Sequence, residues 1–470
     1  MTCPTARQHP KVEPIRLDYE TCANLHNRIF QIAWSSTNKN TESWSLQTWW
    51  ERFSPSEQIA SRLNADLIEF LKRAYYHDNA PAFFYFLQPL TTCEHLLDDP
   101  WFEDRGKDRF INLHHATGFN CGDEMGLLFD QYTCKAAFVE LFDDVIPICD
   151  NGYGWKPLEE IYGAYLEMIK EGKIEACTPD GKKSKESRSD AFGPWIFNDY
   201  TTFDIQKSVE ALKYLLDVIE AKRSSWLKRS GSEEGGGNEK VSLPWTDPAI
   251  LDIAGIQQNT FAREFCEESA KWTRELSFRY IAPGIRIPTV DEFIAQPFNR
   301  NGQRDTFGRK MPVLLFQADK GELVSNQTVP IPNNWLKYGG YTDVPITTGL
   351  YLIGDHRMNQ AFENSCQLLL PFMFGANGWA RLSDNEVMGM EPIDDEPSPL
   401  DVNSELYQSG YNGFFGSRQV QLHKVLTNWA DRVKCGDWTV NETGVEGGIE
   451  KFREADTEAN WQKYWLTLTW

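Results

Sequence analysis

The sequence predicts a mixed α/β fold, and three patterns lead to this prediction. Apolar residues recur at alternating steps of four and three over 205–219, which places them on one face of an amphipathic helix. Two short apolar runs, at 311–316 and 349–354, are bounded by turn residues in the manner of buried strands. The second run precedes a helix predicted at 357–374, and this β–α unit favours a mixed fold over an all-α fold.

Further helices follow from the same kind of periodicity. They are predicted at 61–76, at 158–171 and, as one or two helices, at 249–276. The helix over 205–219 can begin at Thr202 or Asp204, because either side chain can accept hydrogen bonds from free N–H groups at a helix start. All of these helices are expected to pack on a hydrophobic core.

Changes in composition along the chain suggest its division into parts. Two segments rich in Gly, Ser and charge, at 178–190 and 229–240, are typical of flexible loops. The two halves on either side of the second loop are expected to pack together as one catalytic unit. The predicted parts are a loose N-terminal arm at 1–20, a helix-rich half at 21–228, a flexible loop at 229–240 and an α/β half at 241–470.

The net charge of −21 limits the partners that the chain can bind. An acidic excess of this size repels nucleic acids and anionic membranes at long range, so we expect no general binding to DNA or to membranes. The N-terminus has no apolar signal region, and no stretch approaches the roughly 18 apolar residues of a membrane span. Ten cysteines without a CxxC pair are typical of reduced core residues. A cytoplasmic protein is therefore expected.

Fingerprints of several common enzyme classes are absent from the sequence. It contains no GxxxxGK[ST] phosphate loop, no GxGxxG dinucleotide loop, no GxSxG elbow and no HExxH zinc motif. These absences exclude the usual forms of those chemistries. Two basic runs depart from the acidic composition, and each is either solvated loop charge or a local contact for an RNA backbone. The first consists of Lys182, Lys183, Lys185 and Arg188, and the second of Lys222, Arg223, Lys228 and Arg229.

Two other groups of residues raise the question of a metal site. Asp98 and Asp99, with Asn198 further along, are similar in type to the groups that hold Mg²⁺ in diphosphate-ionising terpene enzymes. Acidic doublets are nevertheless frequent by chance in a chain with 68 acidic residues. For His114 and His115 a structural role is favoured, because adjacent side chains point in different directions and rarely serve one metal.

The most unusual stretch of the chain lies at 375–405, where two glycines and a tryptophan are followed by an Arg/Asp pair and by several further acidic residues. Glycines permit close approach of the backbone to a ligand. If the segment around Asp401 and Glu405 is helical, these two carboxylates share one face. Such a pair can bind a guanidinium group or accept a proton from an ammonium group. The structural alternative is an acidic surface loop in which Asp401 caps a helix.

The segment from about Arg274 to Trp470 resembles a set of fungal proteins of similar length. The similar segments are a PVLLFQAD strand, a GLYL strand, LPFMFGANGWARLSD, SELYQSGYN and the closing GGIEKFREADTEANWQKYW. On these segments the chain is identified as a member of the arginine-containing cyclodipeptide synthases of natural-product clusters. The DDxxE motif of that family is matched from Asp401 to Glu405, with Val402 in place of the second acid.

This resemblance implies a Rossmann-like core with additional helices and long loop insertions. It implies an enzyme of secondary metabolism that condenses arginyl-tRNA with a second aminoacyl-tRNA to a cyclo(Arg-Xaa) diketopiperazine, with no cofactor and no metal. Glu405 is then expected to be the catalytic base, and Asp401 is expected to orient it. The other expected contacts are Asp394, Asp395 and Arg381 for the substrate, and Lys182, Lys183, Lys185 and Arg188 for tRNA.

Two other functions stay open at the level of the sequence. One is a Mg²⁺-dependent terpene or prenyl enzyme that uses Asp98, Asp99 and Asn198, and its activity would be lost on chelation. The other is a non-enzymatic interaction scaffold, in which changes at Asp401 and Glu405 would weaken the binding of a partner rather than stop the formation of a product.

Overall fold

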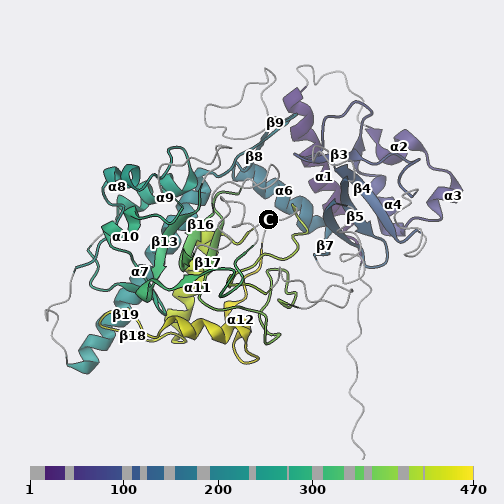
Figure 1. Ribbon diagram of the computed structural model, residues 1–470. Coiled ribbons are helices and arrows are strands. Elements are labelled where there is room, and N and C mark those ends of the chain that lie inside the picture. The colour runs from purple at the N-terminus through teal and green to yellow at the C-terminus, as the bar shows by residue number, and fades with distance from the viewer. Residues whose placement is uncertain are drawn as a thin grey trace, which may run out of the picture.

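Two groups of secondary-structure elements lie side by side, and the C-terminus ends between them (Figure 1). They belong to a computed structural model, which describes the chain apart from several terminal and internal segments. The described residues are 16–37, 47–97, 108–116, 124–141, 154–176, 191–231, 240–272, 275–298, 311–332, 345–353, 362–389, 402–415, 419–468 and 470.

The first group combines helices with an antiparallel sheet. Its helices are α1 (Tyr19–Thr37), α2 (Trp49–Phe53), α3 (Glu57–Ala60), α4 (Ala65–Leu71) and α6 (Leu158–Lys170). Its five-stranded sheet runs in chain order through β3 (Leu87–Leu90), β4 (Phe110–Ala116), β5 (Glu124–Asp130), β6 (Lys135–Leu141) and β7 (Lys156–Pro157). Two smaller sheets pair β1 (Gln47–Thr48) with β2 (Tyr75–Tyr76), and β8 (Ile174–Ala176) with β10 (Trp195–Phe197) and β9 (Ala191–Phe192).

The second group is built on a seven-stranded sheet. The strand order is β17 (Cys366–Leu369), β16 (Gly349–Leu352), β13 (Val313–Ala318), β12 (Ile285–Arg286), β11 (Tyr280–Ala282), β19 (Gly444–Val445) and β18 (Val440–Asn441). A further pair is β14 (Leu323–Val324) with β15 (Ile346–Thr347). The helices are α7 (Thr202–Ser230), α8 (Pro248–Ile253), α9 (Phe261–Ala270), α10 (Val290–Ile294), α11 (Leu422–Cys435) and α12 (Trp461–Tyr464), with 3-10 turns η5 (Asp319–Gly321) and η7 (Ile449–Asp456).

The helix predicted from the periodicity over 205–219 is confirmed as α7, which packs along α11. Its apolar residues at helical spacing are buried in the core of the second group. The capping residue is Thr201, one position before the predicted Thr202, and Asp204 completes a capping box with it. The helix ends at Gly231, whose φ of 69° is a conformation that glycine adopts without strain.

The other helix predictions are confirmed in part. Helix α6 matches the prediction at 158–171, and α8 and α9 match the two helices expected at 249–276. Helix α4 is shorter than the predicted 61–76, because Asn64 caps its start. The helix predicted at 357–374 is wrong where the structure describes that range, since strand β17 pairs antiparallel with β16 there. A short apolar run before a proline is compatible with a buried strand as well as with a helix. In the structure the run is a strand, and side chains on both of its faces are buried.

The fold is mixed α/β, as the sequence predicts, but its described strands do not form a parallel sheet. Within the seven-stranded sheet every described pair is antiparallel except β11 with β19. A Rossmann-like core has mostly parallel strands joined by crossover helices. That finer part of the fold prediction is not confirmed.

The two largest hydrophobic cores among the described residues correspond to the two groups. Along the chain, Phe197 belongs to the first core and Tyr200 to the second. Segments from the second half of the chain return to the first core, where the side chains of Phe362, Phe414, Phe415 and Trp470 are buried. Burying an aromatic side chain contributes about 1.5–3 kcal/mol, so these four residues hold the two groups together. Boundaries at 1–20 and 229–240 stay predictions, because most of both segments lies outside the described residues.

Candidate active site

The backbone around Glu405 adds an irregular partner to strand β17. Glu405 forms an isolated antiparallel bridge with Leu369. On either side of it, the N–H of Leu370 donates to the carbonyl of Ser404 at 2.9 Å, and the N–H of Leu406 donates to that of Leu368 at 3.1 Å. Residues 402–408 contain no helix. The shared helical face that was considered for Asp401 and Glu405 is therefore wrong for this segment, where pairing with β17 competes with helix formation.

The Glu405 side chain is buried and only half satisfied in its hydrogen bonding. It is 3% exposed, and its Oε2 accepts a hydrogen bond from Nε2 of Gln367 at 2.5 Å. Its Oε1 is buried and has no partner among the described residues. A buried oxygen without a donor destabilises the ionised carboxylate and leaves one side of the group able to bind a proton or a polar ligand.

Burial raises the pKa of the Glu405 carboxyl to about 8, and the Gln367 amide opposes this increase only in part. The group therefore exchanges its proton near neutral pH, which is the property expected of a general acid or base. Neighbouring Cys366 is fully buried, and burial together with Glu405 raises the pKa of its thiol well above the ordinary value. A thiol held neutral in this way is a poor nucleophile.

Of the other residues expected at this site, only Arg381 lies within the described part of the chain. Asp394, Asp395 and Asp401 lie outside the described residues, so their predicted roles stay predictions. The guanidinium group of Arg381 lies over the ring of Trp461, 4.8 Å from its centroid, and its Nη1 has no hydrogen-bond partner among the residues that the structure describes. No hydrogen bond or ion pair is described between Arg381 and Glu405. The basic residues proposed for tRNA, Lys182, Lys183, Lys185 and Arg188, also lie outside the described part of the chain.

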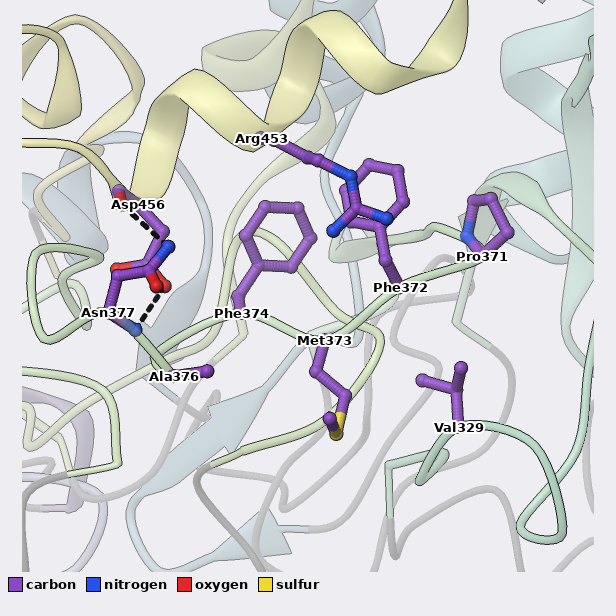
Figure 2. A pocket seen from close by; sticks show the side chains of 9 residues that line it. All are labelled: Val329, Pro371, Phe372, Met373, Phe374, Ala376, Asn377, Arg453 and Asp456. Carbon is purple, nitrogen blue, oxygen red and sulfur yellow. Dashed lines mark hydrogen bonds between the residues drawn. The ribbon is translucent and has the colours of Figure 1, made fainter.

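A cavity of about 380 Å³ lies where the chain continues from strand β17. Its lining is largely apolar, and Figure 2 shows Phe372 and Phe374 on one side with Met373 and Val329 on the other. The Arg453 guanidinium lies 3.9 Å from the ring centroid of Phe372. The cavity lies beside the Glu405 segment in the fold, because the N–H of Phe374 donates to the carbonyl of Asn403. Glu405 itself is not part of the lining.

Asp456 organises the wall of this cavity. Its Oδ2 accepts the N–H groups of Gly375 and Asn377 at 3.1 and 2.9 Å, and its Oδ1 accepts those of Trp379 and Ala380 at 2.9 Å each. Four backbone donors around one carboxylate fix the loop that carries the GANGWA sequence. The sequence interpretation assigned no role to Asp456 or to Gln367. A glycine-rich loop with an acid far along the chain gives no local signal that the two will meet.

The remaining sequence candidates have structural or undetermined roles. His114 is fully buried, with Nδ1 2.8 Å from the carbonyl of Gln88 and Nε2 2.9 Å from Oη of Tyr162. Burial lowers its pKa well below the ordinary value, which fits a neutral core histidine. Asp98 and Asp99 lie outside the described residues. Within the described part of the chain, no group of three or more His, Cys, Asp and Glu residues is placed to hold a metal ion.

Comparison with known proteins provides no relative for this chain. No family model, no curated protein and no solved structure matches it. Among the described helices, none has the length and apolar character needed to cross a membrane. The site's own geometry therefore carries the functional inference.

Proposed function

We propose that the chain is a tRNA-dependent cyclodipeptide synthase and that Glu405 is its catalytic base. One observation carries the proposal: Glu405 is a buried carboxyl whose Oε1 has no partner among the described residues, in surroundings that raise its pKa to about 8. It lies within the SELYQSGYN segment, which is one of those on which the family resemblance rests. The proposal includes arginyl-tRNA as one substrate and no cofactor, as that resemblance implies.

The proposed reaction joins two activated amino acids without further activation. The α-amine of one aminoacyl group attacks the ester carbonyl carbon of the other, forming a C–N bond while the C–O bond to the tRNA ribose breaks. Ionised Glu405 accepts the proton that the attacking nitrogen loses and passes it to the leaving ribose oxygen, which regenerates the carboxylate for the second step. A second attack of the same kind closes the six-membered ring and releases the second tRNA. The enzyme supplies orientation and proton transfer, which fits the absence of a phosphate loop.

Three further features belong to the proposal. The acyl groups must reach Glu405 from the side of its unpaired Oε1, because Oε2 is bound to Gln367. The net charge of −21 opposes tRNA at long range, so the basic run at 182–188 is proposed to contact the RNA backbone. A Rossmann-like core is not required by this chemistry, and the proposal does not depend on it.

Expression of the full chain in a microbial host, followed by mass spectrometry of the medium, tests the function. The expected result is a new mass for a cyclic dipeptide that contains arginine, lost on Glu405→Gln. Glu458→Gln is the matched control, because Glu458 is exposed and the substitution makes the same change in charge. Full product formation by Glu405→Gln would refute the role of Glu405. Abundant folded protein with no cyclic dipeptide would refute the function itself.

A further inference from the structure

A second cavity, of about 550 Å³, lies where the two groups of elements meet. Its walls come from the end of α6, strand β8, the start of α7 and helix α9. The volume falls within the usual range of small-molecule pockets, roughly 300–1,000 Å³. Its lining differs in character from that of the first cavity, because three glutamates face a single lysine, Lys170.

Hydrogen bonds hold two of these glutamates in place. Oε1 of Glu175 accepts a hydrogen bond from Nδ2 of Asn198 at 2.9 Å. Oε1 of Glu264 accepts one from the hydroxyl of Tyr200 at 2.7 Å. Asn198 is 6% exposed, and its own Oδ1 is buried without a partner among the described residues. The pocket thus offers fixed carboxylates together with an amide oxygen that lacks a donor.

An ammonium group already occupies the edge of this pocket. Nζ of Lys207 lies 3.3 Å from Oε1 of Glu171 and 4.1 Å from the ring centroid of Phe203. Phe203 is 37% exposed and lines the pocket. A carboxylate and an aromatic face are the two groups that bind organic cations in proteins. Lys207 shows that both are in place for such a cation here.

We propose that this pocket binds a small organic cation of the alkylammonium or alkylguanidinium class, held by Glu175 and Glu264 with its apolar part against Tyr200 and Phe203. The acidic lining excludes anions by repulsion, and a neutral molecule of the same shape lacks the charge-assisted hydrogen bonds. The ligand bridges α6 and β8 of the first group to α7 and α9 of the second. The proposal goes beyond the proposed function and does not rest on Glu405.

Isothermal titration calorimetry on the purified full chain tests the proposal directly. The probes are agmatine, which carries a guanidinium and an ammonium group, putrescine, which carries only ammonium groups, and 1,4-butanediol as a neutral control. Binding of agmatine or putrescine without binding of butanediol supports the proposal, and the stronger of the two amines identifies the preferred headgroup. No binding of either amine, or equal binding of butanediol, overturns it.

A pair of matched double variants places the ligand in the pocket. Glu175→Gln with Glu264→Gln removes two charges while each glutamine keeps an oxygen to accept the hydrogen bond from Asn198 or Tyr200. We expect it to weaken amine binding about tenfold or more. Glu210→Gln with Glu268→Gln removes the same charge from helices α7 and α9 outside the lining, and should change affinity less than about twofold. Equal weakening in both variants would show a general charge effect and overturn the assigned site.

A single variant in the aromatic wall covers the case in which the charge variant does not fold. Phe203→Leu removes the aromatic face from a side chain that is already partly exposed, so its folding should be unaffected. We expect a loss of amine affinity of about threefold, in keeping with a modest cation–π contribution. Unchanged affinity in this variant would remove Phe203 from the proposed site.

Discussion

Two buried carboxyl groups near strand β17 have opposite surroundings. Asp456 accepts four backbone N–H groups, two on each oxygen. Glu405 accepts one side-chain amide on one oxygen and nothing on the other among the described residues. Both are nearly inaccessible to solvent, with exposed fractions of 4% and 3%. Burial alone therefore does not identify a reactive acid. The number of hydrogen-bond donors around the carboxyl group is what differs between these two residues.

The difference matters for what each group can do. Donors around Asp456 compensate for the loss of hydration on burial, so this side chain can hold a loop in place. Glu405 lacks that compensation, and its pKa rises to about 8. In the account proposed here, Asp456 shapes the wall of a cavity and Glu405 moves a proton.

The largest expected effect is the loss of the Asp456 anchor. Asp456→Ala leaves four backbone donors without their acceptor and should lower the free energy of unfolding by about 3 kcal/mol or more. Urea unfolding of the purified chain measures this change. Glu458→Ala, two residues away at an exposed position, is the control and should have almost no effect. A small effect of Asp456→Ala would mean that the loop is held by other contacts.

A smaller loss is expected from the loop that Asp456 binds. Gly375 has a φ of 92°, and an added Cβ would lie 2.8 Å from the carbonyl oxygen of Met388. Gly375→Ala should therefore cost about 2 kcal/mol of unfolding free energy. Gly163, in the middle of α6, has open space around its position, so Gly163→Ala should be neutral or slightly stabilising. Equal effects of the two substitutions would contradict the described geometry.

The stability of the wild type should depend on pH in a way that Glu405→Gln removes. The pKa of Glu405 is raised on folding from 4.5 to about 8, so the folded state favours the protonated form. Wild-type stability from this group is complete below the unfolded pKa and is lost as the pH rises toward 8. Relative to Glu405→Gln, the wild type should lose up to about 1.4 kcal/mol per pH unit across that window. Thermal or urea unfolding of both proteins between pH 5 and 9 measures this difference. An equal dependence of stability on pH in the two proteins would contradict the raised pKa of Glu405.

The smallest expected effect comes from Arg381, next to the Asp456-bound loop. Its guanidinium group lies over the ring of Trp461 and forms no described ion pair. A double-mutant cycle with Arg381→Met and Trp461→Leu should give a coupling energy of about 0.5–1 kcal/mol. A coupling near zero would mean that the stack contributes nothing. A coupling well above that range would point to a larger role for Arg381 than stacking.

Local patterns in the sequence predict the long helices well. Helix α7 follows from its apolar spacing, and its capping box includes one of the two residues named as possible caps. Strand β17 was mistaken for a helix because a short buried run lacks a period, and its pairing with β16 depends on residues far from it. Pairing across the chain also determines the direction of strands, and so the mostly antiparallel pairing in the seven-stranded sheet was not predictable from runs of apolar residues.

The candidate site shows the same limit. Glu405 was selected from the sequence as one of a pair of spaced acids, but its burial and its bond to Gln367 come from a strand 38 residues away. The contacts of Asp456 with the loop at 375–380 span more than 70 residues. Charge and spacing identify candidates, whereas the donors around a carboxyl are set by tertiary structure, which no local pattern records.

The most direct test of the central claim is the protonation state of Glu405 itself. Infrared difference spectra of the full chain, recorded as the pH is raised from 6 to 9.5, detect a neutral carboxyl by its C=O stretch. Subtracting the same series for Glu405→Gln isolates this one group from other acids. We predict a neutral carboxyl band at pH 6 that disappears with a midpoint near 8. A group that is already ionised at pH 6, or still neutral at pH 9.5, would contradict the account.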